Sequence, residues 1–146
     1  MNKGFTLIEL IAVIVIIALL GMVTVPMIVG MLNNSKEKMF VTNVKELISI
    51  AEQDVTENSR SCKSDDNTSC LYTLAYADDK SVFTFGNEKL NFSGTILKGS
   101  GSIIIDMNGK PKEVNIWNGD LNKCAVLLGD SVVINEEVTK KNECIS

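Results

Sequence analysis

An isolated acid near the start of the chain, Glu9, is the residue with the clearest potential for chemistry. It lies in the segment Phe5–Leu10, which reads Phe-Thr-Leu-Ile-Glu-Leu and directly follows Gly4. No charged residue occurs from Leu10 to Leu32. Because an ionised carboxylate inside hydrocarbon costs roughly 2.5–3.5 kcal/mol on insertion scales, such a group usually has a partner and a role. Glu9 is therefore a candidate functional residue.

The cysteines are the second group of residues that could do chemistry. All of them lie beyond the apolar run, at Cys62, Cys70, Cys124 and Cys144. An even number of cysteines in an exported domain suggests disulfides, and four cysteines allow three pairings. A zinc site is the competing interpretation, but no pair has CxxC spacing and the chain has no histidine.

Composition argues against several classes of function. Without histidine the chain lacks the commonest general base and zinc ligand. It also lacks a glycine-rich phosphate loop and a serine elbow, so we expect neither an enzyme nor a cofactor. The net charge of −4 and the pI of about 4.8 argue against a nucleic-acid partner. The basic clusters Lys110–Lys112 and Lys140–Lys141 are interpreted as solvated surface.

One long helix, from Phe5 to about Asn58, must position Glu9. Its first half is apolar on all sides and long enough to cross a bilayer. Its second half is amphipathic, with an apolar face and a charged face. The charged face carries Lys38, Lys45, Glu46, Glu52 and Asp54. The apolar residues at helical spacing, which we expect to pack on the rest of the domain, are Phe40, Val44, Leu47, Ile48, Ala51 and Val55.

The remainder of the chain predicts a small antiparallel sheet of about four strands. Turn signals at Asn108-Gly109 and Gly129-Asp130 separate apolar runs that alternate or are rich in isoleucine. Leu71–Ala77 is ambiguous between helix and strand, and Glu136–Ser146 is expected to be a polar tail. The candidate strands are Ser81–Phe85, Asn91–Leu97, Ser102–Met107, Glu113–Trp117, Lys123–Leu128 and Ser131–Asn135.

The N-terminal residues resemble the type IV pilin and pseudopilin superfamily. The stretch Lys3-Gly4-Phe5-Thr6-Leu7-Ile8-Glu9-Leu10 and the apolar run with Pro26 carry the resemblance. It implies cleavage after Gly4 by a prepilin peptidase and N-methylation of Phe5. It also implies that Glu9 pairs with the terminal amine of a neighbouring subunit, with pairing to the amine of its own chain as the alternative. Signal peptides also begin with a basic residue and an apolar run, but that run is typically about 7–15 residues long. A simple membrane anchor is the other alternative.

The resemblance also bears on the proline, the cysteines and a possible ion site. Pro26 is implied to be a point where the helix unwinds during assembly, against the alternative of a tolerated kink. Many pilins close a C-terminal loop with a disulfide, which favours pairing Cys124 with Cys144 and Cys62 with Cys70. Some pseudopilins hold calcium, but Asp65, Asp66 and Asn67 lack the ligand spacing of a calcium loop, so no metal is expected.

Together these observations predict an α+β, pilin-like fold in three parts. Residues 1–4 form the leader, 5–32 the transmembrane and assembly helix, and 33–146 the globular domain. The expected function is a structural subunit of a type IV pilus for attachment, motility or aggregation. The chain would be a single-pass membrane protein before assembly and part of an extracellular helical homo-oligomer afterwards, with the pilus assembly machinery as a partner. The alternatives are a pseudopilin of a secretion or DNA-uptake system and a non-polymerising membrane-anchored adhesin.

Overall fold

A computed structural model describes residues 6–58, 62 and 69–145, with the backbone alone at positions 23 and 26. The candidate cleavage residues Gly4 and Phe5 and the calcium candidates at 65–67 lie outside this part of the chain. The chain divides into two compact units, Met1–Lys36 and Glu37–Ser146, and each is described separately.

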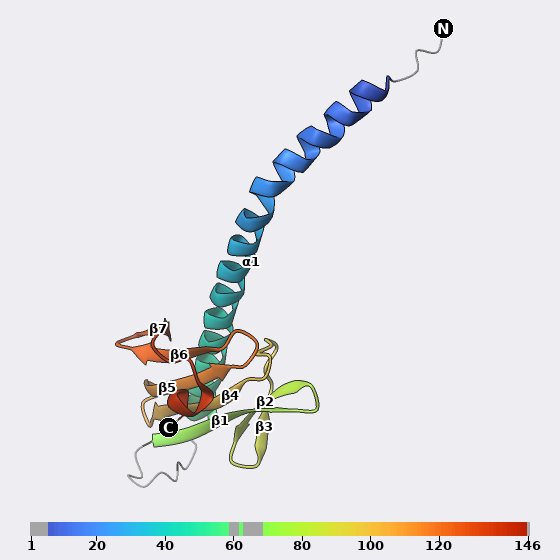
Figure 1. Cartoon of the computed structure of the whole chain (residues 1–146). Helices are drawn as coiled ribbons and strands as arrows, with labels where there is room; N and C mark the ends of the chain where they lie inside the picture. Colours follow the sequence, from blue (N-terminus) through green and yellow to red (C-terminus); the bar gives the residue numbers. More distant parts are fainter. Residues whose placement is uncertain (1–5, 59–61, 63–68, 146) are drawn as a thin grey trace. The chain divides into compact units, whose positions relative to one another are not determined.

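Helix α1, Leu7–Asn58, is the first element and runs through both units (Figure 1). The helical assignment continues through Gly21, Pro26 and Gly30. Unwinding at Pro26 concerns the assembled state, so it stays a prediction. In the first unit the described apolar side chains of α1 are exposed, whereas in the second unit one face of the helix is buried. This change follows from the sequence, which becomes amphipathic after Lys36.

The described part of the second unit contains a seven-stranded antiparallel sheet, in the order β3-β2-β1-β4-β5-β6-β7. The α+β class with a long helix on an antiparallel sheet is therefore confirmed, whereas the prediction of about four strands was wrong. The strands are β1 (Ser69–Ala77), β2 (Lys80–Phe85), β3 (Glu88–Leu90), β4 (Ser100–Asp106), β5 (Pro111–Asn118), β6 (Lys123–Leu128) and β7 (Ser131–Asn135).

The segment Asn91–Leu97 is not a strand, which corrects the sequence-based prediction. Its buried residue, Ile96, packs into the main core, but the segment joins no strand of the sheet. Instead it lies along α1, where Asn43 Nδ2 donates to the Thr95 carbonyl at 2.8 Å and Ser93 Oγ donates to Glu46. Apolar residues in alternation indicate a side that is buried, but they do not specify a backbone partner.

The core lies between one face of the sheet and the predicted stripe of α1. All six stripe residues are buried, and they pack with inward-facing strand residues such as Tyr72, Phe83 and Ile116. Asp54 was predicted on the polar face and is instead buried. Its Oδ2 accepts a hydrogen bond from Tyr72 Oη at 2.9 Å, and its Oδ1 accepts one from Asn58 at 2.6 Å. Burial of this acid is tolerated because its oxygens are hydrogen-bonded.

Shortening a side chain of the stripe should destabilise the second unit. Val44 is fully buried, so Val44→Ala should lower the free energy of unfolding by about 2 kcal/mol through lost apolar contact and a cavity. Met39→Ala is the control, because Met39 is exposed on the same helix and should change stability by no more than about 0.5 kcal/mol. Urea unfolding of both variants would measure the difference. Equal losses would mean that the stripe is not the core.

The β4–β5 turn places a carboxylate where backbone amides can bind it. Asp106 Oδ1 accepts hydrogen bonds from the backbone N–H groups of Asn108 and Lys110, each at 2.8 Å. Gly109 in the same turn has a φ of 79°, a left-handed conformation that glycine adopts without strain. The Lys110 amide, followed by the Asn108 groups and the charge of Lys112, holds the pKa of Asp106 below its ordinary value, against a smaller opposing effect of desolvation.

This lowered pKa predicts a specific pH dependence of stability. The ionised carboxylate contributes its full stabilisation above the unfolded-state pKa of about 3.9. That contribution is lost as the pH falls through the lower folded-state pKa. Asp106→Asn should therefore be less stable than the parent at pH 7, with the difference disappearing in strong acid. Urea midpoints measured from pH 7 to pH 2 would test this, and a difference independent of pH would contradict it.

Candidate functional site

The start of α1 holds the carboxylate of Glu9 against Thr6. Glu9 Oε2 accepts hydrogen bonds from the backbone N–H of Thr6 at 2.8 Å and from Thr6 Oγ1 at 2.9 Å. The Thr6 carbonyl in turn accepts from the backbone N–H groups of Glu9 and Leu10. A threonine before the first helical residue with a glutamate three residues later is the arrangement of a capping box, in which the acid satisfies an N-terminal amide.

The contact with Thr6 was not part of the sequence-based expectation, which gave Glu9 an intermolecular partner. The pattern Thr6-x-x-Glu9 before an apolar run is the sequence signal that could have revealed it. Both hydrogen bonds from Thr6 fall on Oε2, and an ionised carboxylate has about four acceptor sites. Glu9 can therefore cap its own helix and still accept a hydrogen bond from a second donor.

The helix that follows Glu9 presents an apolar surface on all sides. It is long and apolar enough to cross a membrane. Thr24 is the polar exception in this run, and its hydroxyl donates to the Leu20 carbonyl at 3.1 Å within the same helix. This internal hydrogen bond reduces the cost of placing a hydroxyl in an apolar environment. The surface suits either lipid or neighbouring apolar helices.

The C-terminal segment of the chain forms a second candidate region. It covers the face of the sheet that does not pack on α1. Cys124 on β6 forms a disulfide with Cys144, with Cα atoms 5.7 Å apart. Cys144 ends the short helix α2, Lys141–Cys144, which lies against β5 in Figure 1 and which the prediction of a polar tail omitted. The two cysteines and Trp117 form a second buried cluster, with Val138 packed against it. The tail therefore shields Trp117 from water.

The other disulfide joins Cys62 to Cys70, with Cα atoms 4.7 Å apart. Cys70 is a fully buried residue of β1, and Cys62 is also buried. The bridge therefore ties the segment after α1 to the start of the sheet. Within the described residues, no group of three or more metal-ligating side chains could hold a metal ion.

Lys123 on β6 is the centre of an ion-pair cluster. Its Nζ contacts the Glu136 carboxylate and lies 3.8 Å from Glu37 Oε1 on α1. The hydrogen bond and the charge of Glu136, followed by the charge of Glu37, raise the pKa of Lys123 above its ordinary value against opposing desolvation. The cluster joins the second half of α1, the sheet and the start of the C-terminal segment. Such partly exposed pairs at the surface usually stabilise by no more than about 1 kcal/mol.

Comparison with known proteins identifies the N-terminal region. Residues 1–25 match the family model described as the prokaryotic N-terminal methylation motif. This match includes Gly4, Phe5, Thr6 and Glu9, so the capped start of α1 lies inside the motif. No curated protein and no solved structure matches the chain significantly.

Proposed function

This chain carries the N-terminal methylation motif that marks the type IV pilin and pseudopilin superfamily, and from that premise we propose that it is a structural subunit of a type IV pilus. The observation that carries the proposal is the match of residues 1–25, followed by a helix whose described apolar side chains are exposed. The motif implies processing by a prepilin peptidase. The proteins of this superfamily are typically structural and not enzymatic.

Processing is the first step of the proposed mechanism. Cleavage after Gly4 removes Lys3 and leaves Phe5 as the new N-terminus, which is then methylated. When the helix leaves the membrane to join a filament, its N-terminus must leave the cytoplasmic interface. Cleavage removes the charge of Lys3, which would otherwise have to move with it. It also creates a cationic amine four residues before Glu9. The peptidase and the methyltransferase are therefore the first partners that we propose.

Assembly by bundling of α1 is the second step. In the membrane the apolar half of α1 contacts lipid, and in a filament the helices of neighbouring subunits would replace that lipid. Because both environments are apolar, transfer alone gives little driving force, and close packing with polar pairing must set the register. We propose that the Glu9 carboxylate accepts a hydrogen bond from the terminal amine of a neighbouring Phe5. It keeps its two hydrogen bonds from Thr6 at the same time, because these occupy only Oε2.

Mass spectrometry of filaments sheared from the cell surface tests this function. We expect a species that begins at methylated Phe5 and contains both disulfides. A large amount would identify a main pilus subunit, and a trace amount a minor one. Processed chain found only in the membrane would indicate the pseudopilin role instead. As a control, substitution of Gly4 by leucine should leave Met1 in place, and cleavage elsewhere in the parent chain would refute the proposal.

A further inference from the structure

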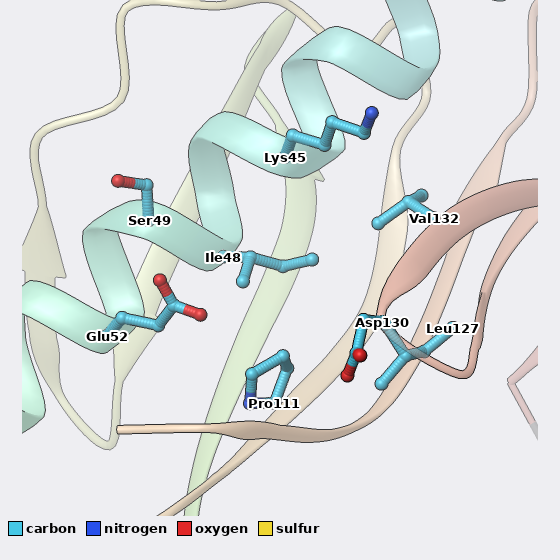
Figure 2. Close-up of a pocket in the computed structure, with 8 residues that line it drawn as sticks. All are labelled: Lys45, Ile48, Ser49, Glu52, Pro111, Leu127, Asp130 and Val132. Atoms are coloured by element: carbon cyan, nitrogen blue, oxygen red, sulfur yellow. The ribbon is translucent and has the colours of Figure 1, made fainter. Parts of the chain in front are cut away.

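A cavity opens between α1 and the β6–β7 hairpin, within the second unit of the chain (Figure 2). Its volume is about 220 Å³, below the range of roughly 300–1,000 Å³ that is common for pockets of small-molecule ligands. The cavity is therefore sized for a single side chain. It belongs to neither the N-terminal motif nor the disulfide clusters.

The floor of this cavity is apolar. Ile48 of α1 points into it, and Leu127 of β6 and Val132 of β7 lie on the opposite side, with Pro111 below (Figure 2). Ile48 and Val132 are among the buried residues of the core, so the floor is fixed by the packing of the whole unit. An apolar floor favours an aliphatic group, because contact with it removes apolar surface from water.

The rim of the cavity carries two carboxylates, from Glu52 on α1 and Asp130 in the β6–β7 turn. No salt bridge or side-chain hydrogen bond joins either carboxylate to another residue of the described part of the chain. Lys45 is the single cation among the lining residues, so the rim has a net charge of −1. In Figure 2 the Lys45 amine points away from both acids. An additional cation would therefore complement the rim.

The ligand that meets both requirements is the side chain of a lysine. Lysine combines an aliphatic stem of four carbons with a compact ammonium group. Its stem can lie on Ile48 and Val132 while the ammonium lies between Glu52 and Asp130. The chain itself is rich in lysine. Two exposed lysines lie on the side of the sheet farthest from the cavity in the strand order: Lys80 at the start of β2 and Lys89 on the edge strand β3.

We infer that this cavity is an interaction site for a second copy of the chain and receives the side chain of Lys80 or Lys89. The cavity lies beside edge strand β7, and the lysines lie at the opposite edge of the same sheet. Contact between two different surfaces of identical subunits is heterologous and continues from one copy to the next. The inference rests on the proposed function, because assembly would bring the copies together at high local concentration.

Zero-length cross-linking between isotopically distinct copies tests this contact. The full-length chain, half of it labelled with ¹⁵N, would be reconstituted at high density in lipid vesicles and treated with a carbodiimide. We expect mixed-isotope amide links from Glu52 or Asp130 to Lys80 or Lys89. They should be about fivefold more frequent than links from Asp120 and Glu137, which are exposed acids away from the cavity.

A charge exchange provides the second arm of the experiment. Asp130→Lys should reduce the mixed-isotope links of Glu52 to the frequency seen for Asp120 and Glu137, and adding Lys89→Glu or Lys80→Glu should restore association between copies. Equal linking of all exposed acids, or links from the cavity to Lys45 of the same copy alone, would overturn the inference. Vesicles do not require filaments, so this failure differs from a failure of the pilus function, which the sheared-filament measurement reports separately.

Discussion

Glu9→Val is expected to leave the chain in the membrane and to reduce its incorporation into filaments about 100-fold. Insertion should continue because the substitution removes a charge from an apolar helix. Incorporation should fall because the amine of a neighbouring Phe5 would lose its partner, at a cost of roughly 2.5–3.5 kcal/mol in an apolar surrounding. Quantitative immunoblots of the membrane and of sheared filaments would measure both effects.

Thr6→Val is the matched control that separates capping from assembly. It removes the hydroxyl that donates to Glu9 Oε2 and keeps the backbone N–H that donates to the same atom. If Glu9 acts between subunits, this variant should lose much less incorporation, about fivefold, as expected for a weakened helix cap of roughly 1 kcal/mol. Equal losses in the two variants would show that Glu9 serves its own helix. Filament yields unchanged by Glu9→Val would refute any role in assembly.

Removal of the disulfide between Cys124 and Cys144 should have the largest effect on the stability of the globular unit. The bridge closes a segment with a sequence separation of 20, for which the chain-entropy relation gives about 3 kcal/mol. Replacing both cysteines with serine should also release the cover of Trp117, which is the single tryptophan of the chain. We therefore expect a lower urea midpoint and a red shift of tryptophan emission in the folded state.

Replacing Cys62 and Cys70 with serine provides the comparison. That bridge spans a sequence separation of 8, which corresponds to about 2.5 kcal/mol by the same relation. Trp117 belongs to the other buried cluster, so its emission should stay unchanged. Both measurements require the full-length chain in detergent under oxidising conditions. A red shift in this second variant, or none in the first, would contradict the assignment of the C-terminal segment as the cover of Trp117.

The sequence predicted the stripe on α1 because helical spacing is a local property. Phe40, Val44 and Leu47 recur at intervals of three or four residues, and such residues share a helix face whatever surrounds them. The hairpins at Asn108-Gly109 and Gly129-Asp130 were predicted for a similar reason, since a turn is specified by adjacent residues. Glu9 and Thr6 also interact across three positions, so the capping contact was accessible to sequence reasoning.

The errors occurred where distant residues decide the structure. An aspartate such as Asp54 is normally expected to face solvent. Tyr72, 18 positions later, donates a hydrogen bond to it inside the core. Leu71–Ala77 was ambiguous alone and became part of β1 because it pairs with both β2 and β4. Strand β3 has only three residues, too few for a recognisable alternation, and it forms by pairing with β2.

The helix that can cross a membrane, the methylation motif and the α+β class could all be predicted from the sequence, because each depends on contiguous residues or on overall patterning. The number of cysteines alone allowed three pairings, and the resemblance to pilins favoured the pairing that the structure shows. The order of the seven strands, the position of the Cys124–Cys144 bridge over Trp117, and the cavity between α1 and the β6–β7 hairpin became evident only from the folded unit. These features bring together residues far apart in the chain, and such contacts are fixed only when the whole unit packs around one core.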